Sequence, residues 1–160
     1  MNRAQKLIDF LGLEPHPEGG YYKETYRSDI IITSPQVAAE RHAVTDIYFL
    51  LTAGQFSRFH RVRHDELWHF YEGDPLRLYD YDAINHTLKT NTLGSVPQND
   101  SYKYVVVADH WQAAEPLGEY SLVGCCVAPG FDFHDFCFFE KDSIEKIRLL
   151  ERYPDMTKFV

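Results

Sequence analysis

The sequence predicts one all-β domain spanning residues 1–160, with a short helix at each end. From Ala43 onward, apolar and aromatic runs alternate with turn signals at intervals of about eight to twelve residues, which is typical of a β sandwich or barrel. Helical periodicity occurs only near the two ends of the chain. No linker, internal repeat or low-complexity segment divides the 160 residues. A chain of this length buries roughly 70% of its unfolded surface, so a single core suffices.

The N-terminal helix is predicted over residues 2–11. Its apolar residues, from Ala4 to Leu11, recur at helical spacing, and Gly12 provides a C-terminal stop. The next segment is LEPHPEGGYYKETYRSD, whose prolines and Gly-Gly pair exclude a helix. Within it, YYKETYR is typical of a strand because of its tyrosines and threonine.

The bend PHPEGG lies beside His16 and Glu18. We interpret it as a structural entry into the first strand, with Gly19 or Gly20 at positive φ. A position at the rim of a pocket is the alternative. No helix N-terminus or P-loop lysine follows it, so it does not fit a phosphate-binding loop.

Strands are predicted next in a series of apolar runs separated by turn residues. After a turn at TSPQ, these runs are VTDIYFLLTAG, QFSRFHRV, ELWHFYEGD, LRLYDYDAINH, TLKTNTLG, YKYVVVADH and YSLVGCCVAPG. The segment APGFDFHDF is predicted to turn into an aromatic strand that serves the core and a dimer contact rather than chemistry. The pattern becomes helical again in SIEKIRLLERYP, where Ser143 or Asp142 caps the start and Pro154 marks the end.

Composition excludes several classes of partner. The net charge is −8, from 16 basic and 24 acidic residues, so we expect no nucleic-acid and no anionic-membrane partner. No apolar run is long enough to predict a membrane span, and the charged N-terminus is not a signal peptide. Three cysteines, Cys125, Cys126 and Cys137, do not form a disulfide framework. We therefore expect a cytoplasmic protein with reduced thiols.

The stretch HRVRHDELWHFYEGDPL concentrates histidines and acidic residues. Strand alternation predicts that Arg58 and His60 share one face, and that Glu66 faces the same lumen from the next strand. A lone histidine in a strand is more often structural, but an arginine and a glutamate of matching parity favour a small-molecule pocket. His64 falls in the probable turn HDE. His69 is expected to face the other side and to fix the sheet by hydrogen bonding.

Several motifs resemble those of the cupin superfamily. The spacing of Gly54, His60, Val62, Glu66 and Gly73 resembles the first cupin signature, with Val62 in place of its second histidine. The second signature resembles VADHWQ, with Gln112 in place of the histidine. More closely, four segments in order resemble one small single-domain cupin family of unassigned function: PHPEGGYYKETYRS, SRFHRVRHDELWHFYEGDPLRLY, VVVADHWQAAE and VGCCVAPGFDF. The resemblance covers nearly the whole chain.

This resemblance implies a double-stranded β-helix, the jelly-roll cupin barrel, with a ligand pocket in its mouth and a homodimeric assembly. In metal-binding cupins the metal ligands correspond to His60, Val62, Glu66 and Gln112 of this chain. Valine cannot ligate and a neutral amide is a poor ligand, so we expect no metal. The alternative is a divalent metal held by His60, His64 and Glu66 in a dioxygenase or isomerase.

The barrel is also similar to that of the metal-free dTDP-sugar 3,5-epimerases, which use a pocket histidine as base and a tyrosine as acid. That likeness implies a metal-independent epimerase or isomerase, with His60 as the base, Glu66 orienting it and Arg58 clamping an anionic oxygen. Tyr48 and Tyr71 are the tyrosines nearest in sequence.

The predicted ligand is a small polar metabolite such as a sugar or a sugar nucleotide. Besides Arg58, its predicted contacts are Trp111, which stacks on a flat ring or sugar face, Gln112, which hydrogen-bonds to it, Trp68, Tyr48 and His69. A non-catalytic ligand-binding or sensing module is the alternative from a different functional class.

Overall fold

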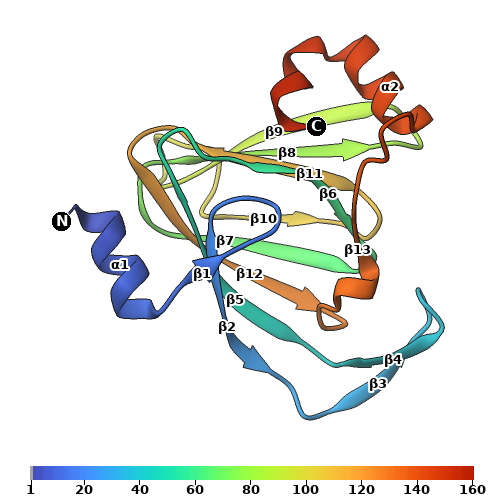
Figure 1. Cartoon of the computed structure of the whole chain (residues 1–160), viewed down its shortest axis with the longest axis horizontal. Coiled ribbons are helices and arrows are strands. Elements are labelled where there is room, and N and C mark those ends of the chain that lie inside the picture. The colour runs from blue at the N-terminus through green and yellow to red at the C-terminus, as the bar shows by residue number, and fades with distance from the viewer. Residues whose placement is uncertain (1) are drawn as a thin grey trace.

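Two antiparallel sheets face each other in the computed structural model, which describes residues 2–160 (Figure 1). In spatial order, the six-stranded sheet contains β1 (Glu14–Pro15), β2 (Tyr21–Arg27), β5 (Thr45–Thr52), β12 (Tyr120–Ala128), β7 (Asp65–Gly73) and β10 (Lys103–Val106). The five-stranded sheet contains β13 (Phe136–Phe138), β6 (Ser57–Val62), β11 (Trp111–Pro116), β8 (Leu76–Asp82) and β9 (Thr87–Leu93). The prediction of an all-β jelly-roll barrel is confirmed.

The main core fills the space between the two sheets at the end where β8 and β9 lie. Its members alternate along their strands and are almost fully buried: Phe49, Leu51, Trp68, Leu76, Leu78, Leu93, Val106, Ala114, Val123 and Cys125. Strand alternation explains this pattern, because every second side chain faces the partner sheet. The core therefore closes one part of the barrel and leaves the remainder for a cavity.

Both predicted end helices are present. Helix α1 (Arg3–Leu11) begins at Asn2, whose side chain accepts a hydrogen bond from the Gln5 backbone, and ends at Gly12 with a left-handed φ of 63°. Its apolar stripe packs on the outer face of the six-stranded sheet, in a cluster that includes Leu50 and Leu122. Among residues 2–160, no helix is long and apolar enough to cross a membrane.

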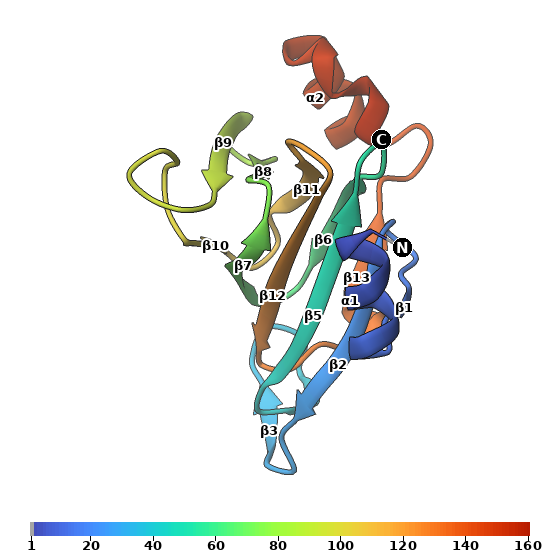
Figure 2. The same cartoon turned by 90° about the vertical axis from the view of Figure 1, so that its left-hand side faces the viewer.

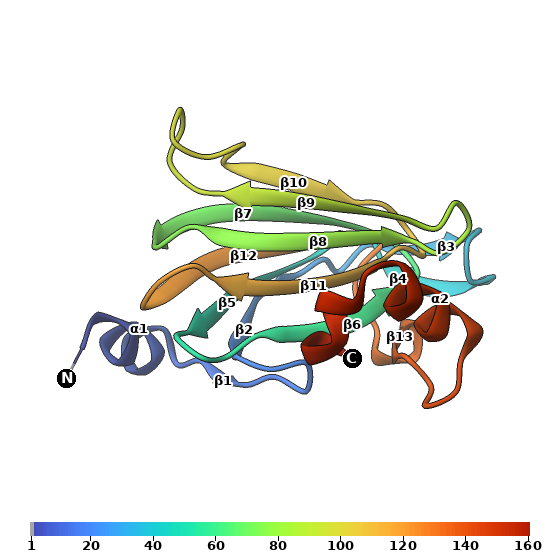
Figure 3. The ribbon, with the colours of Figure 1, turned by 90° about the horizontal axis from the view of Figure 1, so that it is seen from above.

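The C-terminal helices cover the outer face of the other sheet. Helix α2 (Ile144–Arg152) is capped by the Ser143 side chain, as predicted, and is followed by the 3₁₀ helix η2 (Pro154–Phe159). Leu149 and Phe159 pack on the five-stranded sheet. Figure 3 shows α1 at one end of the barrel and α2 near the other.

A hairpin that the sequence did not predict projects from the barrel. Its strands are β3 (Ile31–Ser34) and β4 (Ala39–His42), and it points away from α2 (Figures 1 and 2). The burial pattern along these strands does not alternate, and Ile31 and Ile32 are exposed. Short exposed strands lack the period-two signal that identified the others. The predicted turn at TSPQ begins only at Pro35.

Candidate functional site

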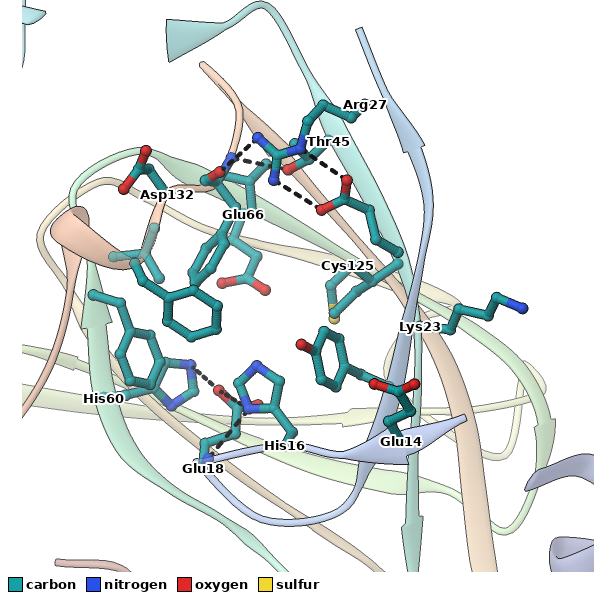
Figure 4. A pocket seen from close by; sticks show the side chains of 18 of the residues that line it. Glu14, His16, Glu18, Lys23, Arg27, Thr45, His60, Glu66, Cys125 and Asp132 are labelled. Atoms are coloured by element: carbon teal, nitrogen blue, oxygen red, sulfur yellow. Dashed lines mark hydrogen bonds and ion pairs between the residues drawn. The ribbon is translucent and has the colours of Figure 1, made fainter. Parts of the chain in front are cut away.

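A cavity of about 560 Å³ opens between the two sheets and borders the main core, with which it shares Cys125. Figure 4 shows polar side chains converging on it from several strands. Its lining combines buried acid–base groups, aromatic rings and a charged rim. The buried groups are His16, Glu18, His60, Glu66 and Cys125, the rings are Tyr22, Phe131, Phe133 and Phe136, and the charged rim is Glu14, Lys23, Glu24, Arg27 and Asp132.

The PHPEGG bend brings His16 and Glu18 into this cavity. Gly19 and Gly20 have φ values of 113° and 73°, and a Cβ on Gly19 would lie 2.1 Å from the Phe56 carbonyl oxygen. The bend can therefore press against β6 only with glycine at that position. The Glu18 carbonyl accepts a hydrogen bond from the Arg58 backbone at 2.9 Å, which anchors the bend to β6. The bend thus leads into β2 with both glycines at positive φ, as the first interpretation expected, and it also forms part of the pocket, as the alternative expected.

A β-bulge in β6 decides which side chains face the cavity. Ser57 pairs with Ala114 and His60 pairs with Gln112, so Arg58 and Phe59 together oppose one residue of β11. The bulge interrupts the simple alternation between Arg58 and His60. His60 lines the cavity, as predicted. The predicted inward position of Arg58 is wrong, because its exposed guanidinium lies over the Phe138 ring at 3.7 Å from the centroid.

Glu18 and His60 form a buried ion pair at the cavity floor. The Glu18 Oε2 atom lies 3.0 Å from His60 Nε2, and both side chains are at least nine-tenths buried. The other ring nitrogen, Nδ1, lies 2.9 Å from the Arg58 carbonyl oxygen, which can only accept, so Nδ1 donates. Burial disfavours both charges, but their attraction and hydrogen bond outweigh it. The pKa of Glu18 is therefore lowered and the pKa of His60 is raised.

Glu66 faces the same cavity in a different electrostatic environment. Burial is the largest influence and the nearby Glu18 charge adds to it, so that the pKa of Glu66 rises to about 7 despite the opposing effects of His60 and Gln112. Burial also raises the pKa of the adjacent Cys125 thiol well above its ordinary value, so this thiol stays neutral. Glu66 is therefore the carboxyl group of this cavity that changes protonation near neutral pH.

A hydrogen-bonded chain orients Glu66. The Trp68 Nε1 atom donates to Gln112 Oε1 at 2.8 Å, and Gln112 Nε2 donates to Glu66 Oε2 at 2.5 Å. An indole N–H can only donate, which fixes the orientation of the Gln112 amide. All three side chains are buried. Gln112 and Trp68 therefore position Glu66 from behind and do not line the cavity, so the prediction that both contact the ligand is wrong.

Removing the Gln112 amide tests this chain. Gln112→Leu leaves the buried Trp68 N–H without an acceptor and removes a hydrogen-bond donor from Glu66. We therefore expect the free energy of unfolding to fall by about 1–3 kcal/mol. The pKa of Glu66 should rise further, because the Gln112 hydrogen bond lowers it. Denaturant titration measures the stability, and Gln98→Leu on the surface should change it by less than about 0.5 kcal/mol. Equal stability of the two variants would contradict the positioning role of Gln112.

Three other predicted ligand contacts lie outside the cavity. Trp111 faces the opposite side of its sheet, where it stacks on Phe139 with ring centroids 3.8 Å apart under the C-terminal helices. Tyr48 packs near α1 and lines an outer groove together with Tyr71. His69 shares the outward face of β7 with Tyr71, as the strand analysis expected. The predicted pocket positions of Trp111, Tyr48 and His69 are therefore wrong, because each lies on an outer face of the barrel.

The positions that correspond to the metal ligands of metal-binding cupins do not fit a metal here. Val62 lines the cavity without a donor atom, and the Gln112 amide is engaged by Trp68 and Glu66. His64 does not reach the cavity, because its Nε2 atom hydrogen-bonds to Ser34 Oγ at 2.7 Å. Within the described part of the chain, no group of three or more His, Cys, Asp or Glu side chains could hold a metal ion. The alternative ligand set of His60, His64 and Glu66 does not converge.

Several residues of the cavity lining were not predicted as site residues, among them Glu18, His16 and three phenylalanines. Glu18 and His16 stood in a motif already recognised as unusual, and the glycine pair was the available signal. Phe131, Phe133 and Phe136 were assigned to the core and a dimer contact. Instead they line the cavity: Phe131 and Phe133 come from the segment between β12 and β13 that includes the 3₁₀ helix η1 (Phe133–Asp135), and Phe136 is the first residue of β13.

Comparisons with known proteins show the family and the fold of the chain. The family model described as Cupin superfamily (DUF985) matches residues 5–139. A hypothetical protein from Leishmania major is 32% identical with a TM-score of 0.85, covering 99% of both chains. A protein from Shewanella oneidensis is 35% identical with a TM-score of 0.81, covering 99% of this chain and 94% of that one. An oxalate decarboxylase from Lactobacillus farciminis, 13% identical with a TM-score of 0.59, covers 91% of this chain and 40% of its own, and shares the fold alone. No curated protein matches the chain.

Proposed function

We propose that this chain, which belongs to the cupin superfamily in its DUF985 family, is a metal-independent proton-transfer enzyme, an isomerase or epimerase, acting on a small polar metabolite. One observation carries the proposal. Two buried carboxyl groups, Glu18 and Glu66, face the same cavity, and their environments move their pKa values in opposite directions. Such pairs assign acid–base roles, because one group stays ionised while the other exchanges protons near neutral pH.

Glu66 is the proposed base, and this replaces the earlier assignment of that role to His60. Both ring nitrogens of His60 are engaged, one by the Arg58 carbonyl and the other by Glu18. A histidine whose pKa is raised by a buried carboxylate holds its proton and is a poor base at neutral pH. The Glu18–His60 pair supplies a fixed charge distribution beside Glu66.

The proposed ligand class is a sugar or a sugar nucleotide. Aromatic rings at Tyr22, Phe133 and Phe136 offer flat apolar surfaces for a sugar face, and polar groups converge at the floor. A cavity of about 560 Å³ lies within the range of small-molecule sites. Carboxylates outnumber cations along the lining, and this favours the sugar over the sugar nucleotide with its negatively charged diphosphate.

Deuterium wash-in from solvent tests the proposal. A panel of aldoses and ketoses with three to six carbons, and their phosphate esters, is incubated with the protein in D₂O and followed by proton NMR. We expect stereospecific loss of a C–H signal next to the carbonyl, with a rate that rises with pH through an apparent pKa of about 7, because the base acts when ionised. Thermal protection by a panel member without exchange would instead support the binding or sensing module.

We further propose a cytoplasmic homodimer without nucleic-acid or membrane partners. All three cysteines are free, which is usual in a reducing compartment. Tyr71 and Val105 are exposed by 48% and 44% on the outward face of the six-stranded sheet, and apolar side chains there suit a second copy of the chain. A monomeric sedimentation mass at micromolar concentration would refute the dimer.

A further inference from the structure

His16 is a buried imidazole for which the proposed proton transfer gives no role so far. Its side chain is only 6% exposed, and its Nδ1 atom lies 3.2 Å from the Glu18 backbone nitrogen. A backbone N–H can only donate, so Nδ1 accepts this hydrogen bond. In the neutral ring the proton therefore resides on Nε2.

The surroundings keep this ring neutral. Burial lowers the pKa of His16, and the His60 charge lowers it further, against the opposing attraction of Glu18. The rings of Tyr22 and Phe49 lie edge to face with it, at centroid distances of 4.5 and 5.9 Å. His16 is thus an uncharged imidazole at neutral pH, with its Nδ1 position already occupied.

The remaining donor of His16 is directed into the cavity. Figure 4 shows the ring nitrogen that does not contact Glu18 facing the open space, with Glu66 and Cys125 across it. Within residues 2–160, no protein atom accepts a hydrogen bond from this Nε2–H group. This N–H group opens onto the cavity, so it is free to donate a hydrogen bond to a ligand oxygen.

The charges around the cavity indicate what else the ligand carries. The cavity lining contains five carboxyl groups but only three cationic side chains, those of Lys23, Arg27 and His60. Arg27 is held by Glu24 through two hydrogen bonds, His60 is held by Glu18, and Lys23 extends away from the cavity in Figure 4. Among the described residues that line the cavity, no cation is left to contact a phosphate group, so the substrate that fits is uncharged.

We propose that His16 is a catalytic hydrogen-bond donor to the carbonyl oxygen of an uncharged α-hydroxy carbonyl substrate, an open-chain aldose or ketose, and that Glu66 moves a proton between its two adjoining carbons. This inference rests on the proton-transfer function proposed above. It names His16 as a second catalytic group and specifies the class of substrate. His16 lies in the bend before β2, whereas Glu66 lies on β7, so the two residues can be tested by separate substitutions.

The reaction balances without any oxidant or reductant. The Glu66 carboxylate takes the proton from the hydroxyl-bearing carbon, whose C–H electron pair becomes the carbon–carbon double bond of an enediolate. The carbonyl π electrons move to the oxygen, where the His16 Nε2–H stabilises the developing negative charge. After a proton shifts between the two substrate oxygens, Glu66 returns its proton to the former carbonyl carbon. A neutral imidazole suits this role, because it donates to the oxygen and remains neutral.

The tautomer of His16 can be measured without knowing the substrate. Long-range proton–nitrogen NMR on ¹⁵N-histidine-labelled protein at neutral pH separates the two ring nitrogens, and His16→Gln assigns the signals. We expect a neutral ring that is protonated at Nε2. A charged His16, or a ring protonated at Nδ1, would overturn the inference and leave the role of Glu66 intact.

Deuterium wash-in with the same sugar panel tests the catalytic role. His16→Phe keeps an aromatic ring but removes the donor, and we expect exchange to slow by about 10²–10³-fold. His16→Gln retains an amide donor and should lose less. The matched control, His69→Phe on the outer face of β7, should exchange at the wild-type rate.

The outcomes separate the two proposals. Exchange that is abolished in Glu66→Gln but unchanged in His16→Phe would overturn the role of His16 and leave the proposed function standing. Exchange confined to the phosphate esters would overturn the uncharged substrate class. If the wild-type protein exchanges no panel member, the proposed proton transfer fails, and this inference fails with it.

Discussion

Glu66→Gln is expected to abolish C–H exchange while making the protein more stable at alkaline pH. The variant keeps the shape of the side chain and an acceptor for Gln112, but it cannot take up a proton. General acid–base groups contribute about 10²–10⁴-fold to rate, so exchange should fall by at least that factor. Burial of the Glu66 charge lowers the stability of the wild-type protein, and catalytic groups commonly lower stability in this way.

The sign of the stability change follows from the raised pKa of Glu66. In the unfolded chain this carboxyl ionises near 4.5, whereas in the folded protein its pKa is about 7. The free energy of unfolding therefore falls as pH rises from 4.5 to about 7, and it stays lower above that range. At about pH 8 we expect Glu66→Gln to be more stable than the wild type by roughly 1–3 kcal/mol.

Denaturant titrations at several pH values measure this effect. The stability difference between Glu66→Gln and the wild type should vanish below the unfolded pKa of 4.5, where both side chains are uncharged. Glu119→Gln, an exposed position, is the matched control and should leave both stability and exchange unchanged. A stability difference that does not depend on pH would contradict the raised pKa of Glu66.

Glu18→Gln is expected to destabilise the protein most at mildly acidic pH. Removing one partner of a buried ion pair leaves His60 without its counter-charge, which typically costs about 3 kcal/mol or more. Glu18 has a lowered pKa, so its contribution is present above its unfolded pKa and is lost as pH falls through the folded value. His60 has a raised pKa, so its contribution is present below its unfolded pKa and is lost as pH rises through the folded value.

The effect of Glu18→Gln should therefore be largest between the unfolded pKa values of 4.5 and 6.5. A double-mutant cycle with His60→Gln, measured by denaturant titration, isolates the coupling between the two side chains. We expect a coupling that diminishes at alkaline pH, where His60 loses its proton in the wild type as well. Parallel stability–pH curves for Glu18→Gln and the wild type would show that the pair is not ionised.

Elements with a local signal were predictable from the sequence. Alternating strands such as β7 and the capped helices α1 and α2 depend on residues close in the chain, and their patterns identified them. The hairpin β3–β4 was missed, because its strands are short and their burial does not alternate from residue to residue.

The composition of the site depended on long-range pairing, which the sequence does not display. The bulge that turns Arg58 away from the cavity arises from the pairing of β6 with β11. Adjacent strand residues face opposite sides, so Trp111 and Gln112 could not both point into the barrel. The sequence does not show that Gln112 points inward, toward Glu66, and that Trp111 points outward, toward Phe139. Glu18 meets His60 because the glycine bend folds back onto β6.

A titration of the glutamate side chains tests the central claim most directly. The side-chain carboxyl carbons of ¹³C-labelled protein can be followed by NMR across pH, in the wild type and in Glu66→Gln. We predict one glutamate resonance that titrates at about pH 7 in the wild type and is missing from the variant. If instead every glutamate carboxyl titrates below about pH 5, in the range of an ordinary carboxyl, Glu66 is ionised at neutral pH like a surface residue and the proposed proton transfer loses its base.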